Sequence, residues 1–404
     1  MRIKMNLPKL LLLLIAINSF AQHLQAQQTI VDSSVYDRLA ELEKQVAYKK
    51  PGEDHFMVVG LATFGFVANK TNITSNGSTQ ISKTNSMADA DHYEFSPMLL
   101  WRHGQKFLLE FEPSFDGNSI GVNWADISYF AAPGLIVRAG YLVIPFGTYN
   151  KRLAAGWIDK LPTDPAGVAD LPPGSDFGVE VEGGLPLGNM KWNYDISVTN
   201  GMQLLPDGEI QGAGIVDNNK NKTITARLGL LPFSNSSLEI GVSGLYGTVG
   251  DDNSPFRGRK SSMYALDVNY VKLFNPILLN IKGQYNYIHV DRQNYINPND
   301  STFYSFDNNT NSGFVQLSIR PTGSRNKLVK NLEAAFRLGN FTTPTNSLWG
   351  QKSNLVEAGI LYWLNWRTVL KFGYLSNKAS STTLGDQGTY TKSGSYFLQF
   401  SIQL

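Results

Sequence analysis

From His55 to the end of the chain, hydrophobic and polar positions alternate with a period of two. The last segment, 394–404, shows this most clearly: Tyr396 and Leu398 alternate with Gln399 and Ser401. Side chains two residues apart lie on the same face of a β-strand, so this period predicts strands with one apolar and one polar face.

Alternation alone fits two architectures. In a sandwich the apolar faces point inward, whereas in a membrane barrel they face lipid and the polar faces line the lumen. The segments are about 10 to 14 residues long, and a tilted membrane-spanning strand needs about 9–11. Aromatic residues stand at segment ends, and short linkers alternate with long ones. These features favour the barrel.

The predicted fold is all-β: a transmembrane antiparallel β-barrel of about 16 strands, preceded by a short periplasmic helix. The last strand must pair with the first, because an open sheet edge cannot lie in hydrocarbon. The long linkers, including 68–91, are predicted to be outer loops. Their Asn/Ser/Thr-rich tracts, 69–87 and 300–312, suggest sugar contacts or simply solvated loops. The strands are expected near 55–67, 92–102, 106–115, 119–131, 135–144, 176–185, 190–200, 222–231, 237–249, 262–273, 277–291, 312–320, 329–340, 354–364, 366–377 and 394–404.

The N-terminus has a different pattern. Arg2 and Lys4 precede an apolar run, 10–17, which small residues follow, so 1–26 is predicted to be a signal peptide cleaved after Ala21 or Ala26. Residues 27–52 contain an amphipathic helix with a narrow apolar stripe, which favours a short periplasmic coiled coil or a cap on the barrel mouth. The barrel domain is 53–404.

Composition narrows the function. The 404 residues include 35 Lys and Arg, 33 Asp and Glu, and no cysteine. This near-neutral balance argues against nucleic-acid binding, and the lack of cysteine excludes thiolate metal sites and cysteine nucleophiles. The longest apolar run is shorter than the roughly 20 residues of a spanning helix. The histidines show no metal-ligand spacing, and no nucleophile–base set is apparent, so we expect neither enzyme activity nor a cofactor or metal.

The linker 145–175 is the candidate pore constriction. It holds five prolines, which make it stiff, and a stiff loop can fold back into the lumen. The alternative is an outer loop packed on the rim. Its candidate constriction residues are Tyr149, Lys151, Arg152, Trp157, Asp159, Lys160 and Asp164, with Asp170 as a further charge.

Strand parity also places charged residues on the lumen wall. Parity assigns eleven acids and eight bases to the lumen, of which the residues named below are the candidates singled out. This slight excess of acids predicts weak selectivity with the outcome resting on the loop. The pairs Glu110/Glu112 and Glu180/Glu182 could accept Lys or Arg from the loop, bind a divalent cation, or be ordinary wall charges. The candidate wall residues are Glu110, Glu112, Asp126, Arg138, Glu180, Glu182, Arg227, Lys282, Arg337, Arg367 and Lys371.

The stretch from Phe107 to Gly201 resembles the phosphate-selective porin family and related trimeric Gram-negative porins. The resemblance rests on Arg138-Ala-Gly-Tyr141 leading into Pro145-Phe-Gly147, on Arg152 with the motif 157–162, and on Val198-Thr-Asn-Gly201. It implies a passive, trimeric channel with an inward constriction loop. The ladder of pore arginines and lysines that phosphate-specific members carry is not evident in this sequence.

The sequence therefore predicts an outer-membrane porin, a general-porin-like member that passes small hydrophilic or charged solutes. Its expected partners are outer-membrane lipid, small solutes or ions, and two further copies in a homo-trimer. The alternative is a non-conducting outer-membrane barrel that acts as an adhesin, receptor or structural anchor.

Overall fold

A computed structural model describes residues 54–87, 93–116, 119–169, 171, 174–212, 217, 219–298 and 300–404. The chain divides into two units at Glu53 and Asp54, and the second unit is described here by itself. The predicted signal peptide, the periplasmic helix of 27–52 and Asp170 lie outside the described residues.

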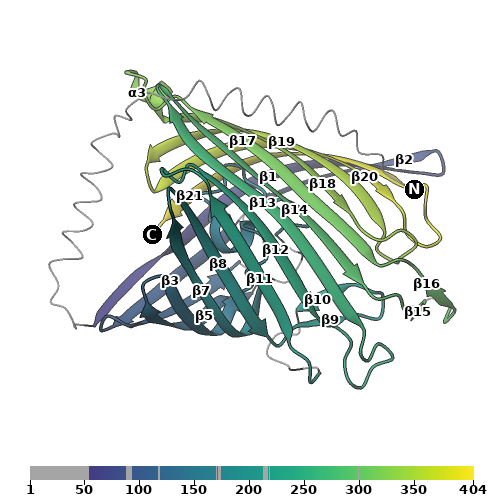
Figure 1. Cartoon of the computed structure of the whole chain (residues 1–404). Helices are drawn as coiled ribbons and strands as arrows, with labels where there is room; N and C mark the ends of the chain where they lie inside the picture. Colours follow the sequence, from purple (N-terminus) through teal and green to yellow (C-terminus); the bar gives the residue numbers. More distant parts are fainter. Residues whose placement is uncertain are drawn as a thin grey trace, which may run out of the picture. The chain divides into compact units, whose positions relative to one another are not determined.

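The second unit is a closed antiparallel β-barrel (Figure 1). β1 closes it, since its residues 61–74 pair with β21 and its residues 55–64 pair with β3. The barrel strands are β1 (His55–Ser75), β2 (Ser78–Met87), β3 (Tyr93–His103), β4 (Phe107–Phe115), β5 (Ile120–Ala132), β6 (Leu135–Val143), β7 (Ser175–Leu187), β8 (Met190–Thr199), β11 (Thr223–Leu231), β12 (Leu238–Thr248), β13 (Lys260–Phe274), β14 (Ile277–Val290), β17 (Asn309–Arg320), β18 (Leu332–Thr342), β19 (Gln351–Asn365), β20 (Thr368–Ser381) and β21 (Tyr390–Gln403).

β2 and β3 pair with successive parts of β1, so together they fill one position in the wall. With that pair counted once, the described residues form sixteen barrel strands, and the predicted fold class is confirmed. Each of the sixteen predicted ranges overlaps an observed strand, and β2 lies in a segment predicted to be a loop. The strands reach this length because a tilted strand must cross the full apolar layer.

The predicted outer loop over 68–91 is wrong for most of its length. β1 continues to Ser75 and β2 returns from Ser78, which makes 66–87 a hairpin. Its turn residues, Asn76 and Gly77, both have positive φ, 49° and 76°. Asn-Gly is the preferred sequence for the tight two-residue turn that joins paired strands. Because the hairpin has polar side chains on both faces, its strands lack the one-sided alternation used to find the others.

Smaller elements fill some of the other linkers. The long linkers hold two short hairpins, β9 (Met202–Leu204) with β10 (Ile210–Gly212) and β15 (Asn294–Ile296) with β16 (Phe303–Ser305). Helix α3 (Lys327–Asn331) lies in the turn before β18, so this strand begins three residues later than predicted. Among the described residues, no helix has both the length and the apolar character to cross a membrane.

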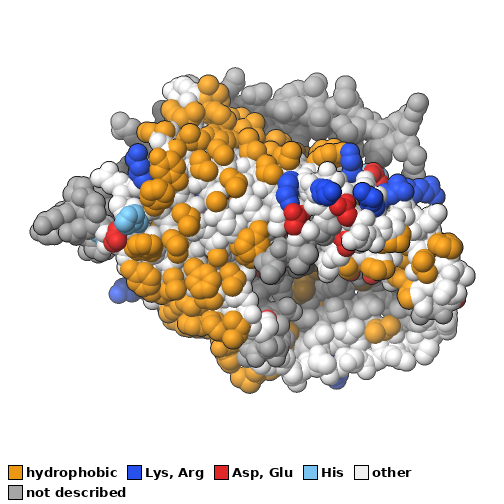
Figure 2. Space-filling view, turned by 90° about the horizontal axis from the view of Figure 1, so that it is seen from below, with side chains coloured by type: hydrophobic (Ala, Val, Ile, Leu, Met, Phe, Trp, Pro, Cys, Tyr) orange, Lys and Arg blue, Asp and Glu red, His pale blue; other side chains and the backbone are white. Residues whose placement is uncertain are grey.

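The two faces of the wall differ as the alternation predicts. Hydrophobic side chains such as Leu266, Val315 and Phe372 point out and are exposed, and Figure 2 shows such residues gathered over part of the outer surface. Inward-facing residues such as Asp267, Gln316 and Lys371 are buried among polar neighbours. An apolar exterior around a polar interior is the arrangement that a barrel in lipid requires.

Candidate functional site

The linker after β6 folds into the barrel. It leaves the wall at Gly147, whose φ of 67° and close contact with Gln284 leave no room for a larger residue. One π-helical turn, η1 (Tyr149–Leu153), follows. The linker returns to β7 beside its start, where the Ile144 N–H donates to the Gly174 carbonyl at 2.9 Å. We call residues 145–174 the inner loop.

An ion pair with Arg337 of β18 holds the middle of the inner loop. The guanidinium donates to both carboxylate oxygens of Asp159, at 2.7 and 2.6 Å, and both side chains are at most 5% exposed. Burial by itself would raise the pKa of Asp159, but Arg337, with Lys282 and Lys371, lowers this pKa to about 2. Asp159 is therefore anionic, and the buried pair fixes the loop to the wall.

Further wall side chains bind the loop backbone. Lys282 donates to the Ile158 carbonyl at 2.6 Å, and Lys371 donates to the Leu161 carbonyl at 3.2 Å. Gln399 of β21 donates to the Pro162 carbonyl at 3.2 Å. Because these bonds come from β14, β20 and β21, the loop covers a broad stretch of the lumen wall.

Gln284 of β14 fixes the start of the loop. Its side-chain oxygen accepts the N–H groups of Thr148 and Tyr149, at 2.8 and 3.0 Å. The Tyr149 hydroxyl lies 2.7 Å from both Asp159 and Asp164, so it links two carboxylates within the loop. These contacts give the loop one defined conformation.

Apolar contacts reinforce this attachment. Trp157 and Leu161 pack against Leu361, Trp363 and Val369, which face inward from β19 and β20. Lys160 lies 4.7 Å from the centre of the Trp363 ring. Part of the lumen wall beneath the loop is therefore apolar, beside the charged and amide side chains that bind the loop backbone.

Lys151 and Arg152 reach back to the opposite wall. The Lys151 ammonium donates to Glu180, to Glu182 at 2.6 Å and to Asp195 at 2.7 Å. Arg152 binds Asp195 and Glu239, each at 3.0 Å. Among the described residues, Glu180, Glu182 and Asp195 are the acids grouped closely enough to share a metal ion, and the ammonium of Lys151 lies between them.

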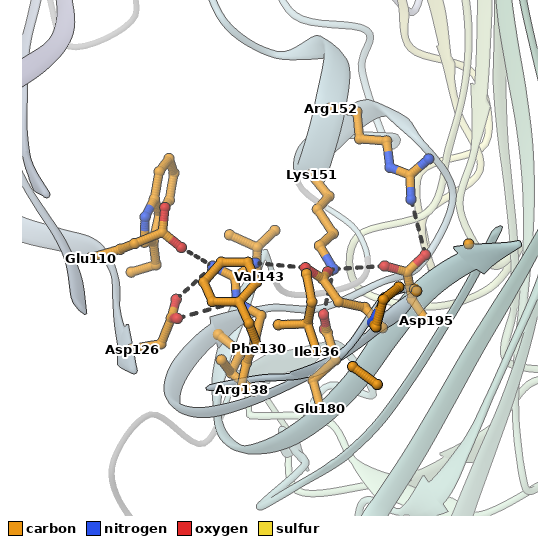
Figure 3. Close-up of a pocket in the computed structure, with 18 residues that line it drawn as sticks. Glu110, Asp126, Phe130, Ile136, Arg138, Val143, Lys151, Arg152, Glu180 and Asp195 are labelled. Atoms are coloured by element: carbon orange, nitrogen blue, oxygen red, sulfur yellow. Dashed lines mark hydrogen bonds and ion pairs between the residues drawn. The ribbon is translucent and has the colours of Figure 1, made fainter. Parts of the chain in front are cut away.

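An aqueous cavity of about 630 Å³ remains between the loop and the β4–β8 wall. In Figure 3, dashed lines join Arg138 to Glu110 and Asp126, while Lys151 and Arg152 extend toward Glu180 and Asp195. Five acidic and three basic side chains line the cavity, which gives it a formal excess of two negative charges. Its lining residues include the turn 132–134 at one end and the inner loop at the other.

The other candidate wall residues have different surroundings. Glu112 accepts a hydrogen bond from Asn123 at 2.9 Å, and Arg227 pairs with Asp267 at 2.6 Å. Arg367 does not line the lumen. It is exposed in the turn between β19 and β20, over the ring of Trp366 at 4.4 Å. The predicted strand 366–377 began two residues too early, so Arg367 was assigned to a face of a strand that starts only at Thr368.

Sequence reasoning missed several residues that hold the loop. Asp195 and Glu357 stood on inward-facing positions, yet nothing local distinguished them from other wall acids. Glu357 accepts the hydroxyl of Thr163 at 2.8 Å. Gln284 and Gln399 are uncharged, and only their partners on a distant segment reveal their role.

Comparison with known proteins supports the fold. The chain matches no known protein-family model. No curated protein sequence matches it. Among solved structures, it resembles the outer membrane channel DcaP of Acinetobacter baumannii, with a TM-score of 0.55 and 12% identity over 88% of this chain and 99% of that one. It also resembles the anion-selective porin from Comamonas acidovorans, with a TM-score of 0.52 and 14% identity over 87% and 100% of the two chains.

Identities this low establish architecture alone. The chain has the barrel fold of outer-membrane porins, and its apolar exterior together with this fold places it in the bacterial outer membrane.

Proposed function

We propose that this protein is a passive diffusion channel for small hydrophilic solutes, in which the inner loop is the constriction. The observation that carries the proposal is the attachment of the loop. It binds β14, β18, β20 and β21, and a charged aqueous cavity remains on the β4–β8 side. Solutes pass through this remaining space.

The charges around the cavity suggest a weak preference for cations. Lining carboxylates exceed lining bases by two, and a pore wall of one net sign attracts the opposite ion. The preference is weak because the three bases lie among the same carboxylates. We do not propose a phosphate-specific channel, since the cavity has no excess of positive charge.

Reconstitution in a planar lipid bilayer tests both statements. We expect stable ohmic conductance steps and, across a KCl gradient, a reversal potential that shows K⁺ to be more permeant than Cl⁻. A folded barrel that never conducts would instead favour the adhesin, receptor or anchor role. An anion preference would contradict the charge argument while leaving the channel intact.

Deleting residues 148–170 tests the constriction separately. The remaining ends can be joined because Ile144 and Gly174 are hydrogen-bonded. We expect larger conductance steps. A matched control deletes 74–79 from the exposed β1–β2 hairpin, which should change conductance little. Equal conductance of the loop deletion and the intact chain would show that the constriction lies elsewhere.

Trimeric assembly also remains a proposal. It rests on the resemblance of 107–201 to trimeric porins and on an apolar groove along β1, β3 and β4. This groove is lined by Phe56, Leu99, Trp101, Leu109 and Phe111. Chemical crosslinking in intact outer membranes should give a ladder that ends at three copies, and a ladder that ends at one copy would exclude the trimer.

A further inference from the structure

The turns at the α3 end of the barrel carry positive charge that has no carboxylate partner among the described residues. These turns, outside the strands, contain five exposed basic residues: Lys106, Arg325, Lys327, Lys330 and Arg367. The one described acid there is Asp54, which bonds to His103 at 2.8 Å. No described carboxylate lies within ion-pair distance of any of the five.

The opposite end of the barrel differs. Its long loops also carry cations, and some of these have described acids beside them. Lys222 pairs with Asp217 at 2.5 Å, and Arg257 lies 3.8 Å from Asp252. Exposed lysines toward that end, such as Lys352 and Lys378, also have no described carboxylate within ion-pair distance. What sets the α3 end apart is that its unpaired cations gather in short neighbouring turns.

Four of these cations belong to two neighbouring turns. Arg325, Lys327 and Lys330 lie in and just before α3, Arg367 lies in the turn after β19, and α3 contacts β19. We call these four residues the basic patch. Asn326 caps the helix by accepting the Leu328 N–H at 2.9 Å, which orders this segment.

Exposed apolar side chains accompany the basic patch. Leu328 is 63% exposed, Leu364 55% and Trp366 52%, and the Arg367 guanidinium lies over the Trp366 ring. They continue the apolar outer face of β18 and β19, where Leu332 and Ile360 are also exposed. Basic residues beside an exposed Trp and Leu are typical of protein surfaces that lie at a membrane interface.

We propose that the basic patch binds the headgroups of anionic phospholipids in the periplasmic leaflet. Short turns of outer-membrane barrels lie on the periplasmic side, which puts α3 at that headgroup layer. Lys and Arg supply the charge for a phosphate group, while Leu328 and Trp366 enter the acyl boundary. We favour lipid over an acidic protein partner because the apolar residues beside the basic patch continue into the membrane-facing surface, which binding to a protein would not require. The binding does not depend on whether the barrel conducts.

The experiment compares phosphatidylglycerol with phosphatidylcholine of the same acyl chains, each added to the full-length barrel in detergent. Native mass spectrometry measures the lipid bound, and thermal unfolding measures the resulting rise in Tm. We expect phosphatidylglycerol to bind more tightly and to raise Tm more, with the difference weakened by added salt. Inorganic phosphate at the same concentration should not reproduce the effect, because it lacks acyl chains.

A charge-neutral variant locates the binding. The substitutions Arg325→Gln, Lys327→Gln, Lys330→Gln and Arg367→Gln should weaken phosphatidylglycerol binding by at least about tenfold, since each basic residue contributes on the order of fivefold near an anionic surface. The control neutralises four exposed lysines toward the other end, Lys83, Lys352, Lys378 and Lys392, and should keep the preference. The heat-dependent shift in gel mobility confirms that both variants fold.

Two results would overturn the proposal. One is equal binding of phosphatidylglycerol and phosphatidylcholine by the intact chain. The other is an equal loss of binding in the basic-patch variant and the control. If the fourfold variant does not fold, Lys327→Gln with Lys330→Gln replaces it, and Lys327→Arg with Lys330→Arg should retain full binding.

Discussion

The two sides of the lumen contain the same kinds of charged side chain but place them in different surroundings. On the β14–β21 side, Arg337 and Lys371 are buried against the inner loop. On the β4–β8 side, Arg138 and Glu182 border an aqueous cavity. Inward-facing charge is therefore buried beneath the loop on one side and borders the cavity on the other, where some of it also binds Lys151.

The largest effect should come from breaking the buried pair. Arg337→Met leaves Asp159 and Glu357 buried without their cation. We expect a loss of about 3–5 kcal/mol in the free energy of unfolding, as for other broken buried pairs. Urea titration of the barrel in lipid vesicles measures it. The matched change on the β4–β8 side, Arg138→Met, should cost less because two of its three acidic partners, Glu110 and Glu182, are 18% and 21% exposed. Equal losses would remove the proposed difference between the two sides.

A smaller loss is expected at the start of the inner loop. Gln284→Leu removes the acceptor of two backbone N–H groups, and leaving such groups buried and unsatisfied costs about 1–3 kcal/mol. The same titration measures this loss, with Gln80→Leu on the exposed hairpin as the control. A stability equal to that of the control would mean that Gln284 does not hold the loop.

Ion selectivity tests the β4–β8 side of the lumen, which borders the cavity. Lys151→Met removes a positive charge from beside Glu180, Glu182 and Asp195. One charge about 6 Å away in water changes the local concentration of each ion about threefold, in opposite directions for K⁺ and Cl⁻, so the ratio of K⁺ to Cl⁻ permeability should rise about tenfold. Reversal potentials in a KCl gradient measure the ratio. Lys392→Met, an exposed change toward the outer end, should leave it unchanged. An unchanged ratio would place the ion path away from Lys151.

Lowering the pH should have the smallest effect on the position of the inner loop. The pKa of Asp159 is lowered to about 2 in the folded chain, whereas an unperturbed Asp has a pKa of about 3.9. The stabilisation from Asp159 is therefore complete above the unfolded value and is lost as the pH falls through about 2. Channel size, measured by exclusion of neutral polymers, should stay constant from about pH 7 to about pH 4; widening in that range would show that another group controls the loop.

Most of the fold could be predicted from the sequence because lipid outside and water inside impose a period of two on every spanning strand. The 66–87 hairpin was missed because both of its faces meet water, so that constraint is absent. The inner loop drew attention through its prolines and charges. Its partners could not be predicted, since pairs such as Asp159 with Arg337 join residues 178 positions apart, and no local pattern encodes which strand the loop will meet.

The most direct test of the proposed solute path is cysteine accessibility, since the chain contains no native cysteine. Ile136→Cys introduces a thiol that lines the cavity, and Ser401→Cys introduces one beneath the loop, against Gly156. Each variant is recorded in a planar bilayer while a charged, thiol-specific methanethiosulfonate reagent is added. We expect the current to fall irreversibly with Ile136→Cys and to stay unchanged with Ser401→Cys. Block at position 401 without block at position 136 would contradict a path between the inner loop and the β4–β8 wall.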